Sequence, residues 1–297
     1  MTENRNLMRF RWTALSMFLC LFINAVFAQP APTPWDRHFK EVLPDGFDPW
    51  CGPVVGVEGS TSVVVRSFSL PNGKTAEVYY PSLDEVSTPV PGVVFVAGNP
   101  DTQVISETGR PWMHSSQAMG WARLCAENGL IAITYENDGK PVACLRVVGE
   151  WLKQNSVDIG VDSERIGTWS ASDGCAAAIE EYQTGHQAFA GIRPYFGVFF
   201  YGDLMLKSDH DTSIPLMVVR VANDSWADGR LIERFVERLR ERGGTVLFQT
   251  HQSGSHSFDT RGDSEETRRI IHETIEFMKS PGTSDDISAS MPTRESL

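Results

Sequence analysis

The sequence lacks the features that several large classes of protein need. Only five of its 297 residues are cysteine, too few for a small protein built on disulfides, and there is no collagen-like repeat. The net charge is −12, whereas a nucleic-acid-binding protein needs a basic surface to neutralise phosphates. The same charge disfavours docking on anionic lipid. Phosphate-binding loops, dinucleotide-binding glycine patterns and heptad repeats are also missing.

What is present is the composition of an acidic globular protein. Hydrophobic residues make up 41% of the chain and charged residues 22%, which is typical of a protein with a packed core. At about 150 residues per domain, the length allows one or two domains. No pattern in the sequence predicts a cofactor.

Residues 1–28 have the pattern of a secretory signal peptide. Three arginines precede an uncharged segment from Trp12 to Ala28, which ends on Val-Phe-Ala, with suitable residues at positions −3 and −1. We expect cleavage after Ala28 and a secreted or periplasmic protein that keeps no membrane contact. The alternative is an uncleaved anchor, because the apolar run is nearly long enough to span a bilayer.

Four cysteines remain after this cleavage: Cys51, Cys125, Cys144 and Cys175. They permit two disulfides with three possible connectivities, or they are free and buried as small hydrophobic residues. The sequence leaves both alternatives open.

The segments that are rich in polar residues and proline lie at the two ends of the chain. We therefore expect an N-terminal extension at 29–59, one folded domain at 60–279 and a flexible tail at 280–297. The oligomeric state is not predicted.

Within the folded domain, strand-like and helix-like segments alternate. Two strands joined by an Asn-Gly turn are expected first, at 63–70 and 76–80. Further strands are predicted at 92–97, 130–134, 165–169, 195–201, 215–221 and 245–250, and helices at 116–128, 141–155, 175–179, 231–239 and 270–278. A hairpin followed by this alternation predicts a mostly parallel sheet with helices on both faces.

Ser172 is the candidate nucleophile. In parallel sheets ligands bind at the carboxyl ends of strands, and Ser172 lies where a predicted strand meets a helix, in Ser170-Ala171-Ser172-Asp173-Gly174. A nucleophile on such a sharp turn needs small residues two positions before and after it. Gly174 meets this need, while Ser170 stands where glycine is usual. The alternative is that Ser172 only caps the helix.

Asp224 and His256 are the candidate acid and base. A serine hydroxyl needs an imidazole to remove its proton, and that imidazole needs a carboxylate to orient it. Asp224 follows the strand that ends at 221, and His256 follows the last strand, so the order along the chain is serine, acid, base. Asp228 is the rival acid, and His251 is the rival base. The alternative for His256 is an ordinary surface histidine.

Two backbone N–H groups are the candidates for stabilising a negatively charged oxygen. One belongs to Asp173, the residue after the nucleophile, and the other to Asn99, in the loop after Gly98. Pro100 has no N–H, so Asn99 is the natural donor of that loop. A simple tight turn at 98–101 is the alternative.

With these residues placed, residues 60–279 resemble the α/β-hydrolase superfamily, and most of all its dienelactone-hydrolase-related esterases. The resemblance implies a mainly parallel sheet of about eight strands. It also implies hydrolysis of carboxylic esters through an acyl-serine. Dienelactone hydrolases proper use cysteine where this chain has Ser172, which favours a general esterase. Ser170 is the second departure, because it replaces the glycine of the usual turn.

The segment from Gly202 to Ile214 is too short for the helical lid that lipases insert there. We therefore expect an open cleft for soluble small-molecule or polymer-attached esters. Within this segment, Asp209-His210-Asp211 is interpreted as a solvated loop rather than a metal site, because three consecutive residues do not easily converge on one ion.

Two other functions remain open at this point. One is a prolyl-oligopeptidase-like peptidase, although such enzymes usually carry a large gating domain that the chain before Gly98 cannot supply. The other is a non-catalytic binding protein with the same fold. A separation of more than about 6 Å between His256 and Ser172 would favour the binding protein, because proton abstraction needs near hydrogen-bond contact.

Overall fold

The computed structural model describes residues 63–81, 89–183, 185–261 and 263–282. The expected signal peptide, the N-terminal extension, Cys51 and nearly all of the expected tail lie outside these residues. Among the residues described, no helix combines the length and the apolar character that crossing a membrane requires.

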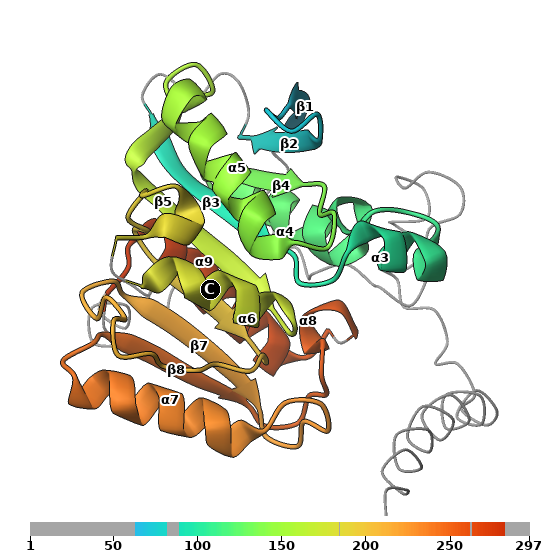
Figure 1. Ribbon diagram of the computed structural model, residues 1–297. Coiled ribbons are helices and arrows are strands. Elements are labelled where there is room, and N and C mark those ends of the chain that lie inside the picture. The colour runs from blue at the N-terminus through green and yellow to red at the C-terminus, as the bar shows by residue number, and fades with distance from the viewer. Residues whose placement is uncertain (1–62, 82–88, 184, 262, 283–297) are drawn as a thin grey trace, which may run out of the picture.

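Eight strands form one sheet in the order β1-β2-β4-β3-β5-β6-β7-β8. β1 pairs antiparallel with β2, β2 pairs antiparallel with β4, and every later pair is parallel. The strands are β1 (Val64–Ser69), β2 (Thr75–Tyr80), β3 (Val90–Val96), β4 (Ile131–Tyr135), β5 (Val161–Ala171), β6 (Gly197–Phe200), β7 (Leu216–Val221) and β8 (Val246–His251). The arrows of β7 and β8 point toward the edge at which α8 lies (Figure 1).

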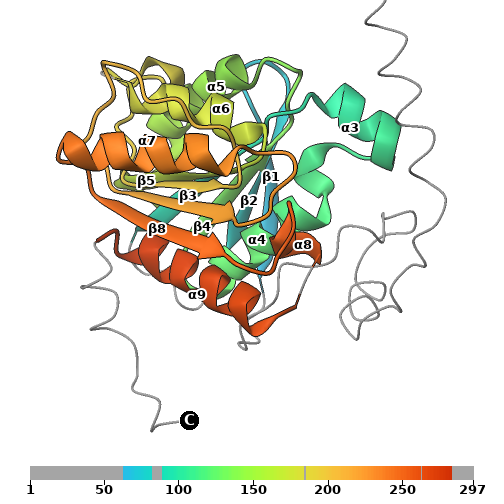
Figure 2. The ribbon, with the colours of Figure 1, turned by 90° about the horizontal axis from the view of Figure 1, so that it is seen from below.

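Helices cover both faces of the sheet. α5, α6 and α7 lie on one face and α4 and α9 on the other (Figure 2). The helices are α3 (Asp101–Thr108), α4 (Ser116–Glu127), α5 (Pro141–Asn155), α6 (Gly174–Ala178), α7 (Gly229–Glu241), α8 (Phe258–Arg261) and α9 (Glu265–Lys279). Short 3-10 helices are η1 (Trp112–His114), η2 (Ile179–Tyr182) and η3 (Gln187–Phe189).

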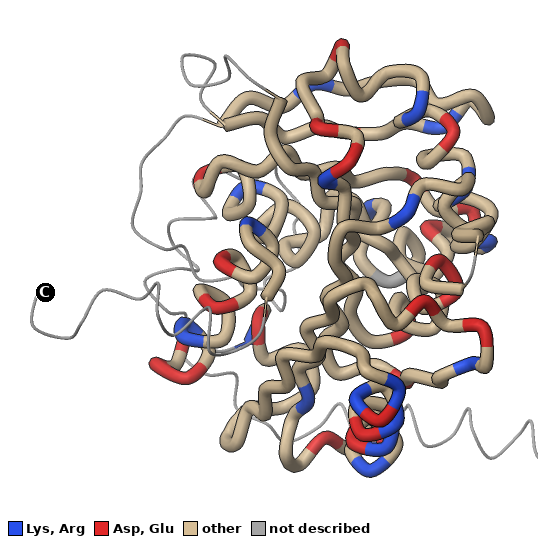
Figure 3. Tube along the Cα trace, turned by 90° about the vertical axis from the view of Figure 1, so that its left-hand side faces the viewer, with Lys and Arg blue, Asp and Glu red and all other residues tan. Residues whose placement is uncertain are grey.

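The hydrophobic pattern explains these layers. All five residues of β4 are buried, as expected for a strand covered on both faces. In α7 one face is apolar and buried, while charged residues of both signs alternate on the solvent side (Figure 3). The buried residues of α7 are Ile232, Phe235, Val236 and Leu239.

An aromatic cluster supports the carboxyl end of β5. The ring of Trp169 lies 5.2 Å from that of Trp121 in α4 and 5.7 Å from that of Phe200 in β6, measured between centroids. All three side chains are buried. Their contacts fix β5 against its neighbours just before the turn that follows the strand.

The structure also differs from the sequence predictions. β5 begins at Val161 rather than at residue 165, because Val161 pairs with Val90 of β3. β6 is shorter than predicted, and α3 and α8 were not predicted. The expectation of a solvated loop at 209–211 is wrong for its central residue, since His210 is buried and its ring stacks on Tyr182. Of the cysteines that the structure describes, Cys125, Cys144 and Cys175 are buried and free.

Candidate functional site

Ser172 lies directly after β5, on a strained turn. Its φ is 52°, in the left-handed region that residues other than glycine rarely adopt. A Cβ on Gly174 would lie 2.4 Å from the carbonyl oxygen of Val96, so only glycine fits there. The residue that caps α6 is Asp173, and helix capping therefore does not account for Ser172.

Ser170 fits at the position where glycine is usual. Its side chain is fully buried, and its hydroxyl donates a hydrogen bond of 3.3 Å to the carbonyl oxygen of Val198 in β6. Because this contact satisfies the buried hydroxyl, a serine at this position is compatible with the turn.

Ser172, His256 and Asp224 lie in one chain of contacts. Ser172 Oγ is 2.8 Å from His256 Nε2, and His256 Nδ1 is 2.8 Å from Asp224 Oδ2. The first distance is within the hydrogen-bond reach that proton abstraction needs, and far below the separation of about 6 Å that would favour a non-catalytic protein. The Asp224 side chain is only 2% exposed and that of His256 is 15% exposed. The structure thus brings together three residues that are far apart in the sequence.

The acceptor-only carboxylate of Asp224 determines where the imidazole carries its proton. Asp224 Oδ2 accepts from Nδ1, so the neutral ring has its proton on Nδ1 and an open lone pair on Nε2. Ser172 Oγ then donates to Nε2. The second oxygen, Asp224 Oδ1, accepts from the backbone N–H groups of Trp226 (2.8 Å) and Ala227 (3.3 Å), which hold the carboxylate in place.

The rival residues lie elsewhere. Asp228 caps α7, and its Oδ1 accepts from the backbone N–H of Arg230 at 3.0 Å. His251 is the last residue of β8, is 2% exposed, and contacts Thr267 Oγ1 through Nε2 at 2.9 Å. Neither residue contacts Ser172 among the described interactions.

The loop after β3 approaches the Ser172 turn closely. A Cβ on Gly98 would lie 2.4 Å from both the carbonyl carbon of Asp173 and the nitrogen of Gly174, so the two backbones are in direct contact. The Asn137 side chain donates a 2.8 Å hydrogen bond to the carbonyl oxygen of Asn99 and fixes that peptide. Within the described part of the chain, the N–H groups of Asn99 and Asp173 have no hydrogen-bond acceptor.

Comparison with solved structures identifies the architecture. Esterase 2 of Thermogutta terrifontis is similar over 76% of this chain and 98% of its own, with 14% identity and a TM-score of 0.55. The Francisella virulence factor BioJ is similar over 75% of this chain and 86% of its own, with 13% identity and a TM-score of 0.53. The chain has the α/β-hydrolase fold. No protein-family model and no curated protein matches the sequence.

The α/β-hydrolase fold confirms the fold class that the sequence predicted, including the eight strands. At this level of identity the similarity concerns the fold alone. No group of three or more potential metal ligands occurs among the residues that the structure describes.

A buried polar network beside His256 was missed by the sequence analysis. The ring of Tyr201 packs edge-on against His256 at 4.8 Å between centroids. The Tyr201 hydroxyl donates to Asp259 Oδ1 at 2.5 Å, while Trp121 Nε1 and Gln117 Nε2 donate to Asp259 Oδ2. Burial and the Asp259 carboxylate raise the pKa of the Tyr201 hydroxyl well above its ordinary value, so that it keeps its proton and remains a donor.

The loop that carries His256 is held at its base by His251 and Glu266. The N–H of Gly254 donates to His251 Nδ1 at 2.7 Å, and the Glu266 carboxylate accepts from the backbone N–H groups of Gln252 and Ser253 at 2.9 and 3.3 Å. Glu266 Oε2 also lies 3.1 Å from His251 Nδ1, but the pKa of His251 is lowered on balance, so the ring is neutral at pH 7 and Nδ1 is the acceptor. Burial lowers its pKa, and the nearby charges of Glu266 and Arg269 act in opposite directions.

This neutral histidine predicts a loss of stability in acid. In the unfolded chain a histidine takes up a proton below about pH 6.5, whereas His251 in the fold resists protonation until lower pH, so stability falls as the pH decreases through this window. The loss is at most about 1.4 kcal/mol per pH unit. We expect the melting temperature to fall less between pH 7.5 and 5.5 in His251→Gln than in the wild type. Equal falls in both proteins would contradict this prediction.

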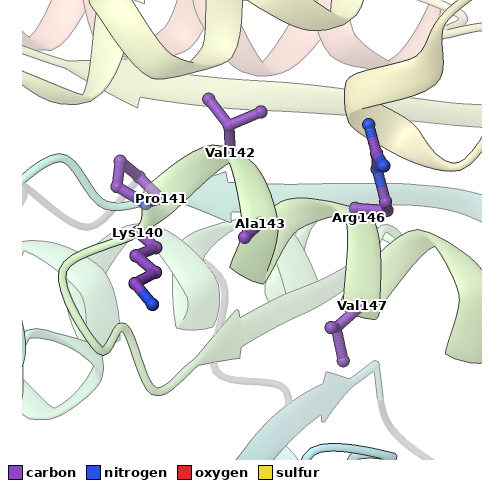
Figure 4. A pocket seen from close by; sticks show the side chains of 6 residues that line it. All are labelled: Lys140, Pro141, Val142, Ala143, Arg146 and Val147. Atoms are coloured by element: carbon purple, nitrogen blue, oxygen red, sulfur yellow. The ribbon is translucent and has the colours of Figure 1, made fainter.

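An open depression runs along the first turns of α5 (Figure 4). Its volume is about 660 Å³, and its lining residues are Lys140, Pro141, Val142, Ala143, Arg146 and Val147. Ser172, Asp224 and His256 are not among them. The depression is therefore separate from the candidate active site.

Proposed function

We propose that the protein is a serine hydrolase that cleaves carboxylic esters through an acyl-serine intermediate. The observation that carries this proposal is the unbroken chain from Ser172 Oγ through His256 to Asp224, with both contacts at 2.8 Å. In this proposal Ser172 is the nucleophile, His256 the general base and acid, and Asp224 the group that orients the imidazole.

The first half of the reaction forms the acyl-enzyme. Ser172 Oγ attacks the ester carbonyl carbon while its proton passes to His256 Nε2. The resulting tetrahedral intermediate collapses, the bond between the carbonyl carbon and the alcohol oxygen breaks, and His256 gives its proton to that oxygen. Asp224 stabilises the imidazolium between these two transfers.

The second half of the reaction restores the enzyme. Water attacks the acyl-serine and gives one proton to His256 Nε2. The acid is then released, and the proton returns to Ser172 Oγ. We propose that the N–H groups of Asn99 and Asp173 stabilise the negative oxygen in both halves, because both backbones lie at the Ser172 turn and neither N–H has an acceptor in the described residues.

Two observations support the ester proposal. Residues 201–215, all of them described, contain no helix that would cover the site as a lid, in keeping with an open cleft for soluble or polymer-attached esters. In addition, several of the solved structures that share the fold are named esterases. The resemblance to dienelactone-hydrolase-related enzymes stays a prediction, and Ser172 in place of cysteine supports a general esterase. Secretion after cleavage at Ala28 is part of the same proposal.

A fluorophosphonate probe tests the proposal directly, because it reacts far faster with an activated serine than with an ordinary one. Esterase 2 of Thermogutta terrifontis is phosphorylated by paraoxon and phosphonylated by sarin in solved structures. We expect the purified protein to be labelled stoichiometrically, and peptide mapping by mass spectrometry to place the label on Ser172. A folded protein without label, or a label on another serine, would contradict the proposal.

A further inference from the structure

Trp226 is an exposed aromatic residue at the candidate active site. Its side chain is 82% exposed, although a tryptophan buries a large apolar area when it is covered. The other large hydrophobic residues that are exposed in the described structure are Val65, Ile105, Val157, Met205 and Leu231. A single exposed hydrophobic residue is ordinary on a protein surface. The exposure of Trp226 therefore indicates a function only because of where the residue lies.

That position is beside the catalytic histidine of the proposed mechanism. The ring of Trp226 lies 6.1 Å from the ring of His256 between centroids, with 35° between the ring planes. Its backbone N–H donates to Asp224 Oδ1 at 2.8 Å, which ties the residue to the carboxylate that orients His256. Trp226 is therefore held at the site by the same residue that orients the base.

The chemistry of the reaction indicates which part of the substrate reaches Trp226. His256 Nε2 must protonate the leaving alcohol oxygen, so this oxygen lies within hydrogen-bond reach of the imidazole. The carbon group bonded to this alcohol oxygen is therefore adjacent to the His256 ring. Because Trp226 flanks that ring, the alcohol part of the ester is the part that meets the indole.

We propose that Trp226 forms a stacking subsite for the alcohol part of the ester, and that the preferred substrates are esters of aromatic alcohols. This inference rests on the proposed esterase function. An aromatic group covers the exposed indole and adds an attraction between the rings, which is worth about 2- to 10-fold in affinity beyond the area that is buried.

A matched pair of esters tests the proposal. Benzyl acetate and cyclohexylmethyl acetate have the same acyl group, similar size and alcohols of similar acidity, but only the first can stack. We expect the wild type to prefer benzyl acetate in kcat/KM by about 2- to 10-fold. This preference should vanish in Trp226→Ala and Trp226→Leu, and part of it should remain in Trp226→Phe. Leucine keeps an apolar side chain, so it separates stacking from simple burial.

Two controls test whether the effect is confined to the alcohol part of the ester and to Trp226. Cyclohexylmethyl butanoate, compared with cyclohexylmethyl acetate, reports on the acyl side, and Trp226→Ala should leave that ratio unchanged. Val157→Ala removes an equally exposed side chain (83%) between α5 and β5, at the amino end of the strand. It should leave the preference for benzyl acetate unchanged. The proposal is overturned if Trp226→Ala keeps the preference, or if it alters the acyl ratio as much as the alcohol ratio.

The test also separates this proposal from the proposed function. If the wild type hydrolyses none of these esters, the esterase proposal has failed, and binding of the free alcohols still decides the role of Trp226. In an NMR titration of Ser172→Ala, benzyl alcohol should bind more tightly than cyclohexylmethanol, and the additional change Trp226→Ala should abolish the difference. Equal binding of both alcohols to Ser172→Ala would overturn the subsite.

Discussion

Replacing Ser172 by alanine should lower the rate of p-nitrophenyl acetate hydrolysis by about a million-fold in kcat. In the proposed mechanism, the substitution removes the only atom that forms the acyl bond and leaves the His256–Asp224 contact without a nucleophile to activate. Fluorophosphonate labelling should disappear together with the activity. Alanine has the same Cβ atom as serine, so the substitution adds no strain at the positive φ of this residue, and the melting temperature should stay close to that of the wild type.

Ser255→Ala is the matched control for this experiment. Ser255 precedes His256 in the sequence and is exposed, and its hydroxyl has only a long contact of 3.5 Å to the His256 carbonyl oxygen. We expect Ser255→Ala to keep the wild-type rate within a few fold. A rate for Ser172→Ala above one hundredth of the wild type would show that another group is the nucleophile.

Asp224→Asn should lower kcat by about ten-thousand-fold, because it forces the wrong tautomer on His256. The backbone N–H groups of Trp226 and Ala227 donate to Oδ1, and they would hold the amide oxygen of an asparagine at this position. The amide NH₂ group would then face His256 Nδ1 and donate to it. The proton of His256 would move to Nε2, where the ring can no longer accept the Ser172 proton.

Asp228→Asn provides the same chemical change four residues away. Asp228 caps α7, and asparagine is an equally good capping residue. We therefore expect Asp228→Asn to retain wild-type kcat and stability. If the two variants had similar activity, Asp224 would not be the residue that orients His256.

Local signals explain why the sequence could predict three residues that lie in contact in the structure. Ser172 lies between a strand-like segment and a run of small residues, and Asp224 and His256 each follow an apolar strand. All three therefore belong to the carboxyl edge of a parallel sheet, where the topology brings them together. The apolar runs likewise predicted the strands and a sheet with helices on both faces.

Contacts between segments that are distant in the sequence could not be predicted from such local patterns. Asp259 joins Tyr201, which is 58 residues away, to Trp121, which is 138 residues away, and nothing in the local sequence marks these partners. α3 was missed because none of its residues except Asp101 is buried among those described, so it has no apolar face to recognise. The exposure of Trp226 is equally a property of the folded surface.

The two contacts of the site span 84 and 32 residues of the chain, which has a consequence for folding. Forming them requires that β5, β7 and β8 already lie in one sheet, and the loop-closure entropy of such distant contacts makes their formation late. A partly folded chain would hold Ser172 without a base. The rate at which a refolding sample becomes reactive toward a fluorophosphonate therefore measures completion of the whole sheet. We therefore expect the proposed activity to appear late in folding, and partly folded chains to be unreactive toward the probe.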